Sequence, residues 1–494
     1  MRGGTKASAL PVAAALWLTA CGGAAESDGA NPDSPAGGGE TLGPGESLGP
    51  PVSLGGDNPC PPQPLTLIDT LAAVLSDVQT QPASARPFLR YVSAAQFRPG
   101  PCNSDDEIEG AVSRASMAVS KVVNAMSHEP RAIVAEAVGP EGLLLRLDLR
   151  NYGWQRPVTV EGQGYDDAWQ AVAARTAIAL ELQGGAASEL ERELGTRVPV
   201  LLSSAFVATA ATAELYYAVL RLPATLVELK REFGIDGGED LDGGPWVRAA
   251  FSNSGVSKEP RGVARYAGSA LRDGYFWQSF DYAPSARSEL LYLDPLTTQA
   301  DAHQVLFSLP NGLPAYFTTD GDGSRLPESL FALDPAQNNG RTRVPSSCVN
   351  CHSGIIAFEQ QARSFVEDNA DLFSGTGLAR VRELFPSMEE MTALSEADSQ
   401  RIIEAAERAG QPEGTPDPVA RISIDYDLEL TFDQVAAELF LDRAALIERL
   451  PSLPENVAAA ATSGVLERSV FEALYLEAAC ALYGAAESSP VGCP

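Results

Sequence analysis

The chain has 494 residues, of which 45% are hydrophobic, and its formal net charge at pH 7 is −30. Length and composition predict a folded protein of about two to four domains, each able to bury its own core. The excess of acidic side chains argues against nucleic acid as a partner, because phosphates are bound by Lys and Arg. It would steer cationic partners towards the protein, although a merely solvated acidic surface is the simpler explanation.

The N-terminus has the pattern of an export signal. Two positive charges, Arg2 and Lys6, precede the apolar run ALPVAAALWLTA that ends at Ala20. This run is too short to cross a bilayer and is typical of a signal peptide. Its end, LTAC, resembles the lipobox of bacterial lipoproteins, so we expect cleavage after residue 20 and lipidation of Cys21. The alternative is an ordinary cleavage site beside an unrelated cysteine.

The next segment, residues 21–63, is dominated by Gly, Pro, Ser and Ala and predicts a disordered tether. We therefore expect an exported protein, held to a membrane by its lipid and facing the periplasm or the cell exterior. The most apolar later stretch, residues 198–223, contains Glu214 and several hydroxyl groups. It predicts a buried helix and not a membrane span.

The body of the chain mixes helices with fewer strands. Residues 64–200 are predicted to be mostly helical, with one apolar stripe on Leu67, Leu71, Val74, Leu75 and Val78. The alternating stretch 142–154 predicts a strand. Two apolar runs around Pro310-Asn311-Gly312 predict a β-hairpin over 303–317, and the DGDG sequence at 320–323 predicts another turn.

The stretch SSCVNCHSG, residues 346–354, contains the motif Cys348-Val349-Asn350-Cys351-His352. This is the attachment pattern of haem c: two thiols three residues apart add to the two haem vinyl groups, and the adjacent histidine binds iron. A zinc site would need four ligands, yet only His128 and His303 remain as histidines. A thioredoxin-like dithiol would need a βαβ context that the sequence does not show. We expect one covalently attached haem c.

Two helices are predicted after the motif. The first covers 354–369. The second begins at Ser395, with Asp398 three residues later, and ends near Arg408 and Gly410. Met388 or Met391, in the loop predicted before the second helix, is the candidate sixth iron ligand, and Met388 is preferred. His303 is the rival ligand.

The remaining cysteines are predicted to form disulfides, because exported thiols oxidise. Proximity in the sequence pairs Cys480 with Cys493 and leaves Cys60 to pair with Cys102. Six cysteines allow 15 connectivities, of which this is the most economical.

The chain resembles a family of large, functionally uncharacterised bacterial c-type cytochrome lipoproteins in which a hairpin precedes a single haem motif. The resemblance covers most of the chain from about residue 85 and is carried by these stretches: LRLDLRNYGW, FVATA, SGVSKEPRGVARY, GYFWQSFDY, LPNGLPAY, SSCVNCHSG and LFPSMEEM. It implies that the hairpin and the haem motif form one unit. Relatives commonly have a histidine where Tyr266 stands here, which makes Tyr266 a third candidate ligand, and a tryptophan where Ala205 stands.

Together these observations predict a mainly α protein with a minor β component (α+β), in which a cytochrome c-like helical module is embedded in a larger body. The expected segments are a signal peptide at 1–20, the tether at 21–63, an α+β domain at 64–302, the hairpin and haem module at 303–410, and a helical region at 411–494. The predicted function is haem binding and electron transfer with a redox partner protein. The alternative is a haem-dependent oxidoreductase, peroxidase-like or oxygenase-like, with an open sixth position.

Overall fold

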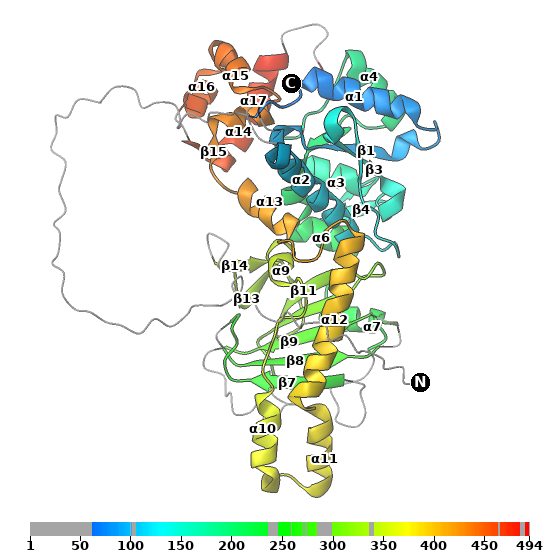
Figure 1. Cartoon of the computed structure of the whole chain (residues 1–494), viewed down its shortest axis with the longest axis vertical. Coiled ribbons are helices and arrows are strands. Elements are labelled where there is room, and N and C mark those ends of the chain that lie inside the picture. The colour runs from blue at the N-terminus through cyan, green and yellow to red at the C-terminus, as the bar shows by residue number, and fades with distance from the viewer. Residues whose placement is uncertain are drawn as a thin grey trace, which may run out of the picture.

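The computed structural model describes residues 62–98, 100, 105–235, 246–257, 259–268, 270–271, 274–283, 299–334, 340–462, 465–484 and 490–493. The predicted signal peptide, Cys21, almost all of the tether, and the predicted pair Cys60 and Cys102 lie outside these residues. The described chain is α+β, as predicted, with more helix than strand. It forms two lobes (Figure 1): a helical lobe of residues 62–222 and 418–493, and a sheet lobe of residues 223–411.

The helical lobe is built around a small mixed sheet with the order β2-β3-β1-β6. Its strands are β1 Leu89–Ser93, β2 Glu136–Val138, β3 Leu144–Asp148 and β6 Val200–Leu202. A short hairpin joins β4 Val158–Val160 to β5 Gln163–Tyr165. A second antiparallel pair is formed by β15 Leu430–Thr431 and β16 Val465–Leu466, which are far apart in the sequence. The first helices are α1 Leu67–Thr80, α2 Asp105–Ala125, α3 Ala168–Arg175, α4 Gly185–Leu194, α5 Ser203–Ala210 and α6 Ala213–Val219.

The two ends of the described chain meet in this lobe. The last helices are α13 Pro418–Tyr426, α14 Phe432–Glu438, α15 Arg443–Arg449, α16 Glu455–Thr462 and α17 Arg468–Tyr483. The predicted apolar stripe of α1 is buried except for Leu75, which is only partly buried. Leu67 and Leu71 share one core with Phe471 and Tyr475 of α17. The predicted disulfide between Cys480 and Cys493 is present and ties the C-terminal segment to α17.

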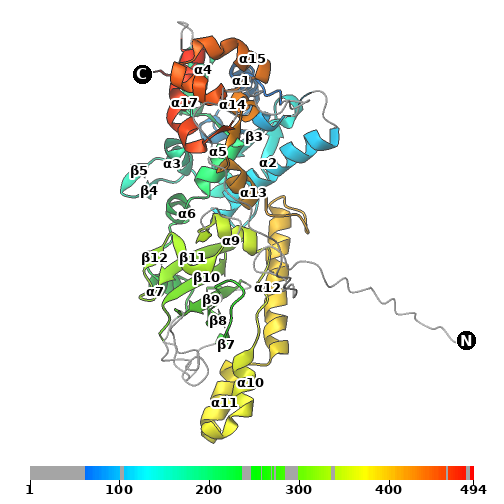
Figure 2. The same ribbon diagram turned by 90° about the vertical axis from the view of Figure 1, so that its left-hand side faces the viewer.

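The sheet lobe is an antiparallel meander with the strand order β12-β11-β10-β9-β8-β7. Its strands are β7 Trp246–Phe251, β8 Arg261–Tyr266, β9 Phe276–Asp281, β10 Ala302–Ser308, β11 Pro314–Asp320 and β12 Arg325–Leu326, and a separate ribbon joins β13 Glu328–Leu333 to β14 Arg341–Arg343. The described helices are α7 Leu226–Glu232, α9 Ser346–Cys351, α10 Gln361–Asp368, α11 Gly375–Leu384 and α12 Met388–Arg408. In Figure 2, α12 runs along the sheet, and α10 and α11 project beyond it.

The predicted hairpin is confirmed as β10 and β11, paired from Ala302↔Asp320 to Ser308↔Pro314. Its turn needs Gly312, which has φ +91°, and whose missing Cβ would lie 3.2 Å from Ala405 of α12. The buried Asn311 side chain donates a hydrogen bond to the carbonyl of Asn124 in α2, 2.9 Å away. The tip of the hairpin is therefore packed against both lobes. The turn at 320–323 is also present, with Asp320 Oδ1 accepting from the Asp322 and Ser324 amides.

The structure divides differently from the predicted segments. The predicted boundary between residues 302 and 303 falls inside β10. The strands before it, β7 to β9, and those after it, β11 and β12, belong to the same sheet as β10. Residues 411–494 are not a separate region, since their helices share a core with α1. A second buried cluster runs through both lobes, from Val123 in α2 to Leu306 in β10.

Three predicted helices also differ in extent. The stretch 198–223 is mostly buried but consists of β6, α5 and α6 in place of one helix. Of the helix predicted over 354–369, only α10 is helical. The helix predicted from Ser395 begins seven residues earlier, because Ser387 and Glu390 form a capping box that satisfies the free amides of the first turn.

No helix among the described residues is long and apolar enough to span a bilayer.

Candidate haem attachment site

The motif residues lie on and just after α9. Cys348 and Cys351 are one helical turn apart, and His352 follows the last helical residue, with its amide donating to the Cys348 carbonyl at 2.9 Å. The helix is pinned from its start, where Ser347 Oγ accepts from the Arg343 amide at 3.1 Å. The sequence therefore folds locally so that the two sulfur atoms and the imidazole come from one compact turn.

The His352 ring is held as a neutral base with one nitrogen directed at the backbone. Its Nδ1 lies 3.4 Å from the carbonyl oxygen of Gly354, a distance at the limit of a hydrogen bond. Burial lowers the pKa of His352 to about 4, although the hydrogen bond to the Gly354 carbonyl raises it; the charge of Arg261 contributes to the lowering. Among the described residues, no hydrogen bond engages Nε2. Metal-binding histidines show this arrangement, with one ring N–H bound to a carbonyl and the other nitrogen available for the metal.

The two cysteines are in different states. Cys348 is a free thiol and only 9% exposed, and burial raises its pKa to about 12. Cys351 is disulfide-bonded, and its partner lies outside the described residues. Attachment of haem through Cys351 therefore requires that this disulfide be opened first.

The segment after the motif is fastened to α12. The Ile355 amide donates to Ser399 Oγ at 2.8 Å. Gly354 permits this approach, because a Cβ there would lie 3.0 Å from the same oxygen. The preceding residue of α12, Asp398, is fully buried and accepts from Arg265 Nε at 2.7 Å and Trp277 Nε1 at 2.8 Å. These bonds fix α12 on the sheet and so fix the backbone carbonyl beside His352.

The motif packs against one face of the meander. Alternate residues of a strand point to opposite faces, and register places Tyr316 of β11 beside Leu306 of β10. The Tyr316 ring lies 5.8 Å from the His352 ring, so this face is the one that meets the motif. Arg261, Asp281 and Gln304 occupy positions on the same face. We call it the motif face.

The rival ligands from the sheet are on the opposite face. His303 is odd-numbered in β10, where Gln304 and Leu306 point to the motif face, and its Nδ1 lies 3.1 Å from Gln278 Nε2. Tyr266 stacks on Trp246 at 5.8 Å and lies beneath the Lys230 ammonium. The structure therefore separates both side chains from His352 by the thickness of the sheet.

The two methionines lie in the first turn of α12 and not in a loop. Met388, the preferred candidate, is 42% exposed, whereas Met391 is fully buried. Met391 is eight residues before Ser399, or about 12 Å along the helix, and Ser399 is where α12 meets the motif segment. Met391 therefore lies about two helical turns from this meeting point, and Met388 lies about three.

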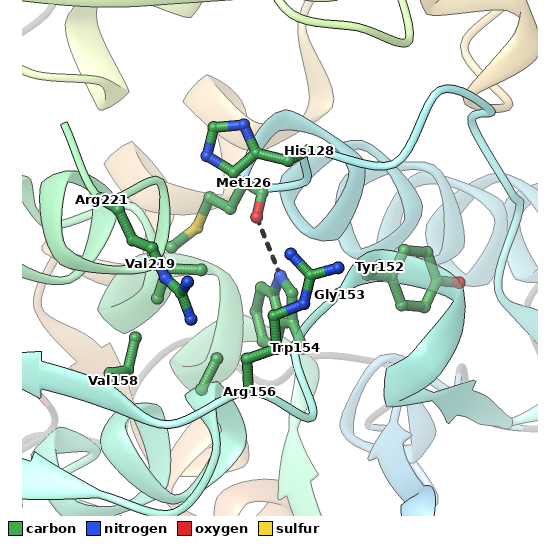
Figure 3. Close-up of a pocket in the computed structure, with 10 residues that line it drawn as sticks. Met126, His128, Tyr152, Gly153, Trp154, Arg156, Val158, Val219 and Arg221 are labelled. Atoms are coloured by element: carbon green, nitrogen blue, oxygen red, sulfur yellow. Dashed lines mark hydrogen bonds between the residues drawn. The ribbon is translucent and has the colours of Figure 1, made fainter.

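His128 lies in the helical lobe, where its Nε2 contacts the Leu220 carbonyl at 2.7 Å. Figure 3 shows it above Met126, with the Arg156 and Arg221 side chains nearby. The pocket that these residues line has a volume of about 20 Å³, which is room for a single water molecule. His128 is therefore not part of the motif site.

A larger groove, of about 620 Å³, opens between the β4–β5 hairpin, α6 and β12. Its wall includes the Tyr217 ring, which Arg325 covers at 4.6 Å. The Cys348 side chain lies close enough for its charge to raise the pKa of Tyr217, although burial is the larger cause. Tyr217 is therefore the residue of the groove wall whose electrostatic environment includes the motif.

Comparison with protein-family models, with characterised proteins and with solved structures gave no match to this chain. In the part of the chain that the structure describes, no three His, Cys, Asp or Glu side chains converge as metal ligands do.

The sequence predicted the motif but not Tyr316 and Arg261, which lie near His352, nor Asp398, which holds α12 on the sheet. Tyr316 lies in the stretch LPNGLPAY that was singled out as part of a hairpin. Alternation along β11 would have assigned it to a face, but not to the face that carries the motif.

Proposed function

We propose that the protein is a mono-haem c-type cytochrome whose role is one-electron transfer. The observation that carries the proposal is the state of His352 within its CxxCH sequence. The imidazole is neutral, Nδ1 is directed at the Gly354 carbonyl, and Nε2 has no hydrogen bond among the described residues. These are the properties that a proximal iron ligand requires.

The two cysteines of the motif fit a covalently attached haem on one condition. Cys348 is a free thiol one helical turn from Cys351, which matches the two thioether positions. Because a thioether and a disulfide exclude one another, the mature protein must carry Cys351 without its disulfide. When bound, haem supplies an iron centre that cycles between the ferric and ferrous states.

The polypeptide contributes position and environment. The α9 turn holds the three attachment atoms, the Ser399 bond to the Ile355 amide holds the segment behind them, and burial keeps His352 uncharged. In this proposal α9 to α12 form the cytochrome c-like module. The proposal also includes a membrane anchor on Cys21, because of the LTAC sequence, and a cationic redox partner, because of the acidic net charge.

The test is mass spectrometry of the mature protein after acid–acetone extraction, with one haem expected to remain covalently bound. A Cys351→Ala chain should yield extractable haem or none. The matched control is the Cys480→Ala/Cys493→Ala chain, which loses a disulfide far from the motif and should keep its haem. A wild-type protein without bound haem, made in a host that attaches haem c, would refute the proposal.

The groove beside Tyr217 favours a second candidate, a haem-dependent oxidoreductase, because it offers a binding volume near the motif. The two candidates differ in the sixth iron position. A low-spin ferrous haem that ignores carbon monoxide supports electron transfer, and a high-spin haem that binds it supports catalysis.

A further inference from the structure

Two buried hydrogen-bond donors on the motif face lack partners among the described residues. The hydroxyl of Tyr316, a residue only 3% exposed, makes no hydrogen bond, and neither does Nη2 of Arg261, a residue 8% exposed. A buried polar atom without a partner costs about 1–3 kcal/mol. Such atoms are rare in folded proteins and call for an explanation.

Both side chains are held in place by the sheet. The Tyr316 amide donates to the Tyr216 hydroxyl at 2.9 Å, and the Tyr316 ring packs against His352 at 5.8 Å. Arg261 Nε donates to Asp281 Oδ1 at 2.5 Å. The other carboxylate oxygen of Asp281 is used by Ser279 and Gln304. Asp281 therefore fixes the guanidinium but leaves Nη2 without an acceptor.

The two groups share one chemistry. A guanidinium nitrogen can only donate a hydrogen bond. A tyrosine hydroxyl can donate as well as accept, and here it also has a hydrogen free to donate. Their natural partner is an acceptor-only anion, and a carboxylate fits best because charge-assisted bonds to Arg are the strongest of this kind. Haem carries two carboxylates, its propionates, so the anion need not come from a separate ligand.

We propose that Tyr316 and Arg261 are the residues that bind the haem propionates, and that the motif face of the meander forms the polar wall of the haem site. This inference rests on the proposed function. It assigns to β8 and β11, which precede the haem motif in sequence, a direct part in holding the group.

The test compares four full-length, haem-loaded variants. Tyr316→Phe and Arg261→Lys each remove one unpartnered donor with little change in shape or charge. Tyr275→Phe and Arg468→Lys are the matched controls. Tyr275 is fully buried with its hydroxyl bonded to the Gly312 carbonyl, and Arg468 is a buried arginine of the helical lobe that binds Glu438. The readouts are the propionate bending vibration in resonance Raman spectra and the midpoint potential.

We expect Tyr316→Phe and Arg261→Lys to lower the propionate vibration frequency. We also expect them to raise the ferric-to-ferrous ratio several-fold at a fixed potential, because a less neutralised propionate favours ferric iron. Both controls should leave the vibration unchanged. A second measurement is the melting temperature. In the haem-free chain the hydroxyl of Tyr316 is unsatisfied, so Tyr316→Phe should leave the melting temperature unchanged or raise it. In the haem-loaded chain the same substitution should lower it.

The two levels of inference fail separately. Absence of covalent haem from the wild-type protein would overturn the proposed function and this inference with it. An attached haem whose propionate vibration and potential are the same in wild type, Tyr316→Phe and Arg261→Lys would overturn this inference alone. A tyrosinate charge-transfer band that disappears in Tyr316→Phe would also overturn it, since Tyr316 would then be an iron ligand.

Discussion

Each lobe buries an arginine–carboxylate pair, and the two pairs are completed differently. In the helical lobe, Arg468 donates to both oxygens of Glu438, at 2.5 and 3.0 Å, and its Nε donates to the Tyr426 carbonyl at 2.8 Å. In the sheet lobe, the Arg261 side chain makes one hydrogen bond, to Asp281, and its Nη2 has no partner among the residues that the structure describes. Each of the three guanidinium nitrogens of Arg468 has an acceptor, whereas Nη2 of Arg261 has none among the described residues.

This difference separates a structural ion pair from one suited to a ligand. A buried pair that satisfies itself fixes the packing of its neighbours and gains nothing from a third group. A pair with an unused donor is improved by any acceptor that enters. The Arg468–Glu438 pair is therefore expected to be indifferent to haem, and the Arg261–Asp281 pair to depend on it.

Substitutions that break these ion pairs are expected to have the largest effect on the free energy of unfolding. Glu438→Gln should lower the free energy of unfolding by about 3–5 kcal/mol, because it leaves Arg468 buried with a reduced partner. Urea unfolding of haem-free and haem-loaded chains should show the same loss in both. Asp281→Asn should cost less in the haem-loaded chain, where a propionate shares the charge of Arg261. Equal losses for Asp281→Asn in both chains would remove the distinction between the lobes.

The next effect is that of the disulfide in the helical lobe. The Cys480→Ala/Cys493→Ala chain should lose about 3 kcal/mol of stability, because the short loop that the bond closes gains entropy when unfolded. Thermal unfolding measures the loss. The visible spectrum of the attached haem should not change, and a changed spectrum would mean that the two lobes are coupled.

A pH effect is expected in the sheet lobe. Because burial lowers the pKa of His352 to about 4, the unfolded chain binds more protons than the folded chain between that value and about 6.5. The contribution of His352 to stability is therefore full above this window and lost as the pH falls through it. In the haem-free chain, His352→Phe should flatten the pH dependence of urea unfolding in this window. An unchanged slope would place the titration elsewhere.

The smallest effect concerns the start of α12. Ser387→Ala should cost about 1 kcal/mol, because it removes the side chain that caps the first turn. Ser395→Ala should be close to neutral, since its hydroxyl only bonds back to the Thr392 carbonyl within the helix. Urea unfolding of the two variants distinguishes the observed start of the helix from the predicted one. The reverse order of the two losses would contradict the structure.

Local features were predictable because they depend on neighbouring residues. The α1 stripe, the hairpin at 303–317 and the Cys480–Cys493 bond each follow from a short pattern, and the structure has all three. Helix starts were less predictable, since Ser387 and Ser395 both precede an acidic residue at capping distance. Ser387 is favoured over Ser395 as the start of the helix by the packing of the earlier turn, in which Met391 is buried.

The sequence by itself determined the chemistry of the motif, because CxxCH brings two thiols and an imidazole together within five residues and needs no distant contact. Only the tertiary structure decided what surrounds that motif. Strand alternation places Tyr316 and Gln304 on one face of the sheet and His303 on the other. The packing of α9 decides which of these faces contacts His352. That choice rests on contacts between residues far apart in the chain, such as Arg265 with Asp398 and Ile355 with Ser399. No local pattern encodes such contacts.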